Sequence, residues 1–341
     1  APSTVIVAPS GILRLASATE ATHDYLVVAT DEGWKLAAPT GLTLDDCARR
    51  PGAVREGRYV RAVTAPGMEG RVPAVAALDS FVDVTLRRLD VAAERRELIA
   101  REKIDYLFAP PDWVELLAGA PTVGVANLQV DAVFTSHPCH LHELAHVLVN
   151  FSLEKLPLYT LPLLQEGLAV HLGGRWERGP DFLAQVGRMF LADGYVSVGE
   201  LLPRDGFYRL GADLSYPAAG VLAGWLLESA GPAEFANTYL ALSGTPERLS
   251  GLSADRVAAV LAAPLGLPDS TVASLDPALA AHLASLPGNP LRAAPAGADG
   301  EPLRRFTDAG LHLRLWRDED EWIIEIIAPH GAEPAGALLV P

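Results

Sequence analysis

The segment LHELAH, residues 141–146, constrains the fold most strongly, because it places two histidines and a glutamate close together in the chain. His142 and His146 are four residues apart, which puts their side chains one turn apart on the same face of a helix. Both imidazoles can then bind one metal ion, with Glu143 near the same side. This HExxH arrangement is typical of two zinc ligands and a carboxylate that takes a proton from zinc-activated water.

A catalytic zinc also needs a third protein ligand, with the fourth position left for water. The segment LLQEGLAVHLGG supplies a candidate, Glu166, twenty residues after His146. The intervening residues leave room for a loop and for a second helix packed against the first. We therefore expect one helix from Pro138, which is tolerated in a first helical turn, to about residue 150, and another over 162–173.

The pattern along the whole chain predicts an α+β protein with four parts. Residues 1–75 contain short β-type runs and form a β-rich N-terminal unit. Residues 76–180 form the part that carries the histidines and Glu166, and 181–290 are almost entirely helical. Residues 291–341 consist of a Pro/Gly/Ala-rich linker and a β-type tail.

Within the second part, the spacing of apolar residues over 77–103 predicts one long amphipathic helix. The segment DWVELLAG, residues 112–119, predicts a short helix. Runs rich in β-branched and aromatic residues predict three strands, at 103–110, 123–129 and 131–136.

HELAH, followed at this distance by EGLA, resembles the gluzincin metallopeptidases, which include thermolysin-like and aminopeptidase-N-type enzymes. The resemblance covers about residues 77–290. It implies a thermolysin-like zincin catalytic domain followed by a helical subdomain, with one Zn²⁺ per chain bound by His142, His146 and Glu166. Carried over in the same way, Glu143 becomes the general base of a peptidase that hydrolyses peptide bonds with metal-activated water.

Gluzincins commonly have a His or Tyr that stabilises the oxyanion of the tetrahedral intermediate. Tyr216 lies fifty residues after Glu166, where we expect it to open a helix, and it is the candidate for this role. Tyr208 is the reserve candidate. Gln165 matches a position where relatives often have an amide that steadies a ligand, and an ordinary surface glutamine is the alternative.

The chain also departs from these relatives. Thermolysin-like enzymes commonly have a carboxylate four residues after the glutamate ligand, where this chain has Val170. Aminopeptidase-N-type enzymes use a GAMEN motif to hold the amino terminus of the substrate, and the corresponding segment here is GVANL, residues 124–128. Exopeptidase activity therefore does not follow from the resemblance.

Several alternatives stay open. A cysteine, Cys139, forms a stripe with His142 and His146 that also fits a closed structural zinc site. His137 and His140 are expected to form a polar helix start, and His171 to be structural. A gluzincin-type hydrolase of a non-peptide substrate, or a non-catalytic peptidase-like binding module, would retain much of the same sequence.

Charge and hydropathy limit the partners. The net charge of −15 argues against nucleic acid, and the sequence has no apolar run of the roughly 18–20 residues that span a bilayer. We expect a peptide or protein substrate that pairs with an edge strand at 130–136.

The start at Ala1 fits an exported protein, periplasmic or extracellular, whose signal peptide has been removed; a cytoplasmic protein is the alternative. Whether Cys47 and Cys139 pair, and the oligomeric state, are open.

Overall fold

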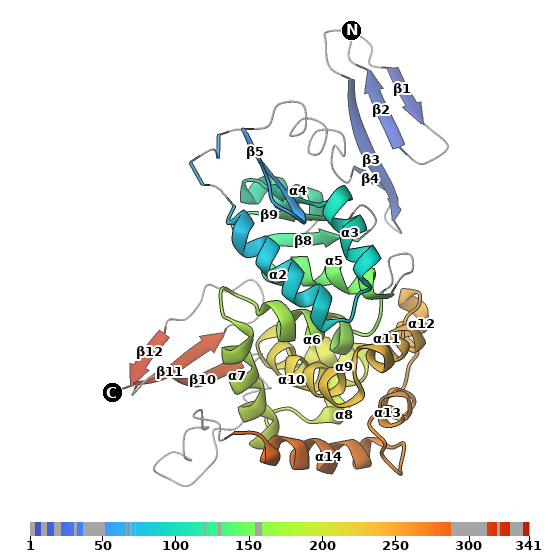
Figure 1. Ribbon diagram of the computed structural model, residues 1–341, viewed down its shortest axis with the longest axis vertical. Helices are drawn as coiled ribbons and strands as arrows, with labels where there is room; N and C mark the ends of the chain where they lie inside the picture. The colour runs from blue at the N-terminus through green and yellow to red at the C-terminus, as the bar shows by residue number, and fades with distance from the viewer. Residues whose placement is uncertain are drawn as a thin grey trace. The chain divides into compact units, whose positions relative to one another are not determined.

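The computed structural model describes residues 52–65, 67–68, 70–71, 73–118, 121–128, 131–153 and 159–287, and the backbone of seven strands towards the two ends of the chain (Figure 1). The fold is α+β, as expected: a small mixed sheet with helices precedes a run of helices. The chain divides into two compact units, residues 1–157 and 158–341.

The first unit is built on a five-stranded mixed sheet with the order β5-β6-β7-β9-β8. Its strands are β5 (Ala53–Glu56), β6 (Val60–Thr64), β7 (Ile104–Phe108), β8 (Gly124–Asn127) and β9 (Ala132–Thr135). β6, β7 and β9 are parallel, whereas β5 and β8 are antiparallel to their neighbours at the two edges.

The position of the edge strand differs from the prediction. β9 lies in the segment 130–136 that was expected at the edge, but it pairs with β7 on one side and with β8 on the other. All four residues of β9 are buried, as an inner strand covered on both faces requires. β8, with the sequence GVAN, is the edge strand next to β9, and three of its four residues are only half-buried.

The described part of the first unit contains four helices: α2 (Val75–Arg88), α3 (Ala93–Glu102), α4 (Pro111–Ala118) and α5 (Leu141–Leu153). α2 packs against α5, and both α4 and α5 contact β8 and β9. α4 contributes Val114 to a buried apolar cluster that also contains Leu107 of β7 and Phe134 of β9. The sheet therefore provides the surface on which α5 lies.

The long helix expected over 77–103 was a wrong prediction, because the chain forms two helices there, α2 and α3. Asp90 adopts a φ of 53°, and its N–H donates to the Arg87 carbonyl while the Val91 N–H donates to the Leu86 carbonyl. This pair of hydrogen bonds is a Schellman motif, which ends a helix. Val91 is then buried, so the turn returns the chain to the core.

The histidine-bearing helix begins later than the sequence suggested. α5 starts at Leu141, and Pro138 lies in a turn, where its carbonyl accepts the Ala74 N–H at 3.1 Å. Pro138 therefore does not begin α5. Its carbonyl instead connects the segment before α5 to the start of α2.

Residues 159–287 of the second unit form helices and their connections. The helices are α6 (Pro162–Gly173), α7 (Pro180–Ala192), α8 (Val198–Leu201), α9 (Arg204–Arg209), α10 (Ala212–Ala230), α11 (Pro232–Ala241), α12 (Pro246–Ser250), α13 (Ala254–Ala262) and α14 (Val272–Ser285). α6 begins and ends as predicted, with Pro162 at its first turn and Gly174 at φ 73° after it.

α10 is the centre of this unit and packs against α6, α7, α9 and α11. Every residue from Leu214 to Leu227 is buried, so the helix is covered on all sides. Gly167 of α6 allows the two helices to approach closely, because a Cβ at this position would lie 2.5 Å from the Ala219 carbonyl oxygen. The prediction that Tyr216 opens this helix was wrong, because α10 begins at Ala212 and Tyr216 lies in its second turn.

The remaining strands form two antiparallel sheets in chain order. They are β1 (Thr4–Val7), β2 (Ile12–Ala16), β3 (Thr22–Thr30) and β4 (Gly33–Leu36), and then β10 (His312–Asp318), β11 (Glu321–Ile327) and β12 (Ala337–Val340). The expected domain boundaries at 75, 180 and 290 stay predictions. In the described part of the chain, the structure contains no helix with the length and apolar character needed to cross a bilayer.

Candidate metal centre

α5 places His142 and His146 one turn apart, as the spacing predicts. Their ring centroids are 4.9 Å apart, and the ring planes are at 89° to each other. His142 is 2% exposed and His146 9% exposed. The remaining turns of α5 bury apolar side chains, including Leu144, Val147 and Leu148, which explains why this segment folds as a helix against the sheet.

Glu143 projects from the same helix and is held by the edge strand. The Ala126 N–H of β8 donates to Oε2 of Glu143 at 2.9 Å. Nε2 of His140 lies 3.9 Å from Oε1, the other carboxylate oxygen. The Glu143 side chain is 15% exposed, so its carboxylate is mostly enclosed and has a defined position.

His140 belongs to a hydrogen-bond network at the start of α5. The Thr135 hydroxyl donates to the Val123 carbonyl at 3.0 Å, so its oxygen is left to accept from Nδ1 of His140 at 2.8 Å. This contact orients the ring so that Nε2 is directed towards Glu143. Gly124 makes room for the ring, since a Cβ there would lie 2.3 Å from Nδ1.

Tyr106 of β7 ties the same turn to the sheet. Its hydroxyl donates to the His137 carbonyl at 2.6 Å and accepts the His140 N–H at 2.8 Å. Burial raises the pKa of Tyr106 far above its usual value, so the hydroxyl stays protonated as a donor. The segment before α5 is therefore held by contacts from both neighbours of β9 in the sheet: Tyr106 of β7 on one side, and the residues at the start of β8 on the other.

Glu166 projects from α6 and is mostly buried, with 17% of its side chain exposed. Oε2 of Glu166 lies 3.6 Å from Nη1 of Arg175, which follows the end of α6. The sequence pattern had given no signal for Arg175, because an arginine after a helix end is common on protein surfaces.

The structure brings one donor atom from each of His142, His146 and Glu166 within 4.8 Å of the other two. Two imidazole nitrogens and one carboxylate oxygen form a ligand set that can bind a metal ion. Cys139, His137 and His140 are not part of this group. Cys139 is an exposed free thiol, and Cys47 lies outside the described residues.

Both tyrosines that are candidates for the oxyanion role lie close enough to Glu166 for its charge to affect their pKa values. Burial raises the pKa of Tyr216, the charge of Glu166 raises it further, and a hydrogen bond with Arg175 opposes these effects. Partial burial and then Glu166 raise the pKa of Tyr208. Tyr216 is 9% exposed and Tyr208 is 52% exposed, so the two candidates differ chiefly in their access to solvent.

The other residues singled out on α6 differ in character. Val170, at the position where relatives have a carboxylate, is 1% exposed and packs against Gly220 of α10. His171 packs over Gly224, and its Nε2 lies 3.6 Å from Oε1 of Glu228. His171 is thus a helix-packing residue, as expected. Gln165 is half-buried.

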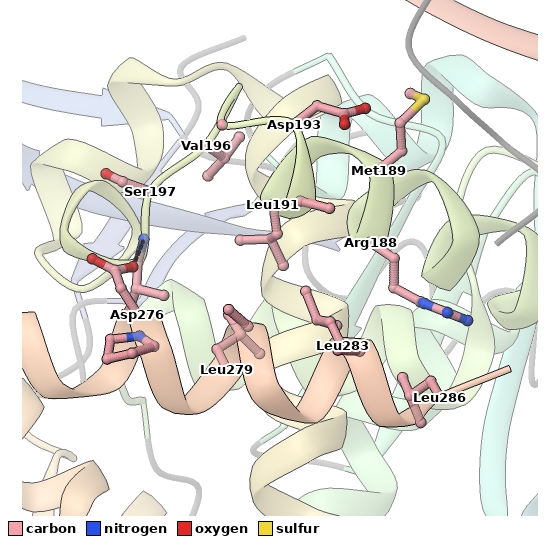
Figure 2. A pocket seen from close by; sticks show the side chains of 16 residues that line it. Arg188, Met189, Leu191, Asp193, Val196, Ser197, Asp276, Leu279, Leu283 and Leu286 are labelled. Atoms are coloured by element: carbon pink, nitrogen blue, oxygen red, sulfur yellow. Dashed lines mark hydrogen bonds between the residues drawn. The ribbon is translucent and has the colours of Figure 1, made fainter. Parts of the chain in front are cut away.

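A separate groove of about 750 Å³ lies between the C-terminal part of α7 and α14 (Figure 2). The side chains of Leu191, Leu279 and Leu283 point towards one another across it. The groove contains none of the predicted site residues.

Comparison with models of known protein families and with curated proteins gave no match for this chain.

Proposed function

We propose that the chain is a zinc-dependent peptidase of the gluzincin type. The observation that supports this proposal most strongly is the grouping of His142, His146 and Glu166, each of which has one donor atom within 4.8 Å of the other two. Two histidines and a carboxylate are the ligand set of catalytic zinc sites that retain an open position for water. When bound, zinc would lower the pKa of a water towards about 7 and polarise the substrate carbonyl.

The setting of Glu143 supports its role as general base. It follows a metal-binding histidine on α5, and the Ala126 N–H fixes one carboxylate oxygen at 2.9 Å. In the proposed reaction, Glu143 accepts a proton from the attacking water and returns it to the leaving amine. Tyr216, near Glu166, is proposed to donate a hydrogen bond to the oxyanion.

The sheet supports a thermolysin-like arrangement in which an extended peptide pairs with β8. In the ladder with β9, the Val123 carbonyl accepts the Ser136 N–H, so the N–H and C=O groups of Gly124 and Ala126 face away from β9. The Ala126 carbonyl therefore lies on the outward side of the edge strand, beside the bond to Glu143. A substrate N–H can bond to it, which would place the peptide along the general base.

The decisive test is Glu143→Gln, which keeps the size of the side chain but removes the proton acceptor. We expect peptide hydrolysis to fall by about 10²–10⁴-fold while one zinc per chain is retained, measured by elemental analysis. Unchanged hydrolysis would exclude Glu143 as the base. A wild-type protein that binds zinc but cleaves only non-peptide esters or epoxides would change the substrate class.

Zinc-edge X-ray absorption tests the ligand set independently of activity. We expect nitrogen and oxygen neighbours only, and zinc binding should be lost in Glu166→Ala. Sulfur in the first coordination shell would place Cys139 on the metal and favour a structural site. Absence of zinc from protein purified without chelator and supplied with the metal would favour a non-catalytic binding module.

A further inference from the structure

Arg175 is held in a tight turn that its own sequence does not favour. The backbone groups of Arg175 and Arg178 bond to each other at 3.1 and 2.9 Å, and the two residues between them have positive φ, 50° at Trp176 and 60° at Glu177. Such a turn usually contains Asn or Gly, because the left-handed conformation is unfavourable for other L-residues. The chain thus maintains a strained turn directly after the helix that carries Glu166.

The turn places the Arg175 side chain against two aromatic rings. Its guanidinium carbon lies 3.7 Å from the centroid of Tyr216 and 5.0 Å from the centroid of Trp176. The Arg175 side chain is 26% exposed. Stacking leaves the N–H donors of a guanidinium in its own plane, where they match the two oxygens of a carboxylate.

The charge balance next to Glu166 indicates what Arg175 can bind. In the protein alone, the guanidinium lies 3.6 Å from Glu166 and balances its charge. Once Glu166 holds a divalent cation together with two neutral imidazoles, the same arginine adds a positive charge to a centre that is already positive. A bound anion would relieve this repulsion, because opposite charges at such separations favour each other in a partly buried site.

The surroundings of Arg175 are accessible and aromatic. Trp176 is 40% exposed and Tyr208 is 52% exposed, and the Arg204 guanidinium lies 5.2 Å from the centre of the Tyr208 ring. A second arginine and two exposed rings therefore adjoin the candidate site on a chain with a net charge of −15. This local chemistry favours a peptide group with a negative charge.

We infer that Arg175 binds a carboxylate of the substrate next to the metal, so that the enzyme prefers peptides with an acidic side chain or a free C-terminus close to the scissile bond. The inference rests on the proposed function and adds a substrate class to it. Arg175 acts as a substrate-binding residue, and Tyr216 and Trp176 hold its guanidinium in place.

The first experiment measures zinc binding, not activity. Zinc is titrated into the full chain with and without acetate, for the wild type, Arg175→Gln and Arg178→Gln. Arg178 is the matched control, because it lies in the same turn, is exposed and stacks on Phe182 at 5.3 Å. We expect acetate to raise the zinc affinity of the wild type and of Arg178→Gln at least about threefold, and to have no such effect in Arg175→Gln, since coupled binding is reciprocal.

Equal acetate effects in the wild type and Arg175→Gln would mean that acetate binds the metal alone, and would overturn the inference. No acetate effect in the wild type would overturn it too. Arg175→Lys guards against loss of fold in Arg175→Gln. It keeps the charge but not the planar pair of donors, so the acetate effect should be intermediate.

The second experiment maps cleavage of a peptide mixture by mass spectrometry. Asp, Glu or the chain terminus should be enriched within two residues of the bonds cleaved by the wild type and Arg178→Gln, and this enrichment should vanish in Arg175→Gln. Cleavage by the wild type without enrichment would refute the inference but leave the peptidase proposal intact. A wild type that binds zinc but cleaves no peptide would instead refute the proposed function.

Discussion

Gly124→Ala tests whether the edge strand and the start of α5 fit together as described. A Cβ at Gly124 would lie 2.3 Å from Nδ1 and 2.5 Å from Cε1 of His140, and 3.1 Å from Oγ1 of Thr135. Ordinary van der Waals contact begins at 3.4 Å, so the His140 ring has to withdraw by about 1 Å. It cannot withdraw and keep its 2.8 Å hydrogen bond to Thr135.

The expected cost follows from three contributions. Overpacking costs about 1–3 kcal/mol, and loss of the hydrogen bond between Thr135 and His140 adds about 1 kcal/mol. Replacing a strand glycine by alanine offsets about 0.5–1 kcal/mol of this, because alanine loses less backbone entropy on folding. We therefore expect Gly124→Ala to destabilise the first unit by about 1–3.5 kcal/mol.

A double-mutant cycle with His140→Ala provides the assay. Stability of the wild type, both single variants and the double variant is measured by urea unfolding. Removing the ring removes the clash, so Gly124→Ala should cost close to nothing in the His140→Ala background, or should stabilise. Costs that add to within about 0.5 kcal/mol would refute the reasoning, because they would show that the two residues do not interact.

Two further predictions concern other residues. Tyr216→Phe should lower kcat by about 10²–10³-fold with little change in KM or zinc content, as steady-state kinetics and elemental analysis would show; unchanged kcat would remove Tyr216 from the oxyanion role. Asp79→Asn should destabilise the protein by about 1.5–3 kcal/mol in thermal unfolding, because Oδ2 of Asp79 accepts the N–H of Arg58, which the NH2 group of an asparagine cannot do, and because the charge that strengthens the bonds from Tyr59 and Val60 to Oδ1 is lost. A change below about 0.5 kcal/mol is typical of an ordinary surface site and would contradict this account.

The sequence predicted the local elements better than their arrangement. Helix periodicity and glycine at a helix end identified α6 almost to the residue, because these signals depend on neighbours in the chain. The break at Asp90 was missed, since its left-handed conformation depends on burying Val91 in the core. The order of β8 and β9 was also missed, because sequence order does not fix which strand lies at an edge.

The same distinction separates the candidate ligands from the residues around them. His142, His146 and Glu166 carry a signal because helix geometry and motif spacing are local. The bond from Ala126 to Glu143 joins a strand to a helix, and its donor is a backbone group that any residue would supply. The guanidinium of Arg175 owes its position to a turn with unusual residues and to the ring of Tyr216, neither of which the motif specifies.

The role of β8 in holding Glu143 also restricts how a peptide can bind. The outward N–H of Ala126 already donates to Glu143, and the outward N–H of Gly124 donates to the Thr122 hydroxyl. The Gly124 carbonyl accepts from the same hydroxyl at 2.8 Å. An extended substrate that leaves these bonds intact therefore has the Ala126 carbonyl as its contact on this stretch of the strand. A contact at the Ala126 carbonyl, beside Glu143 as the proposed general base, would set the register of the proposed peptide substrate, and a side chain outside the strand, such as that of Arg175, would then provide the side-chain selectivity.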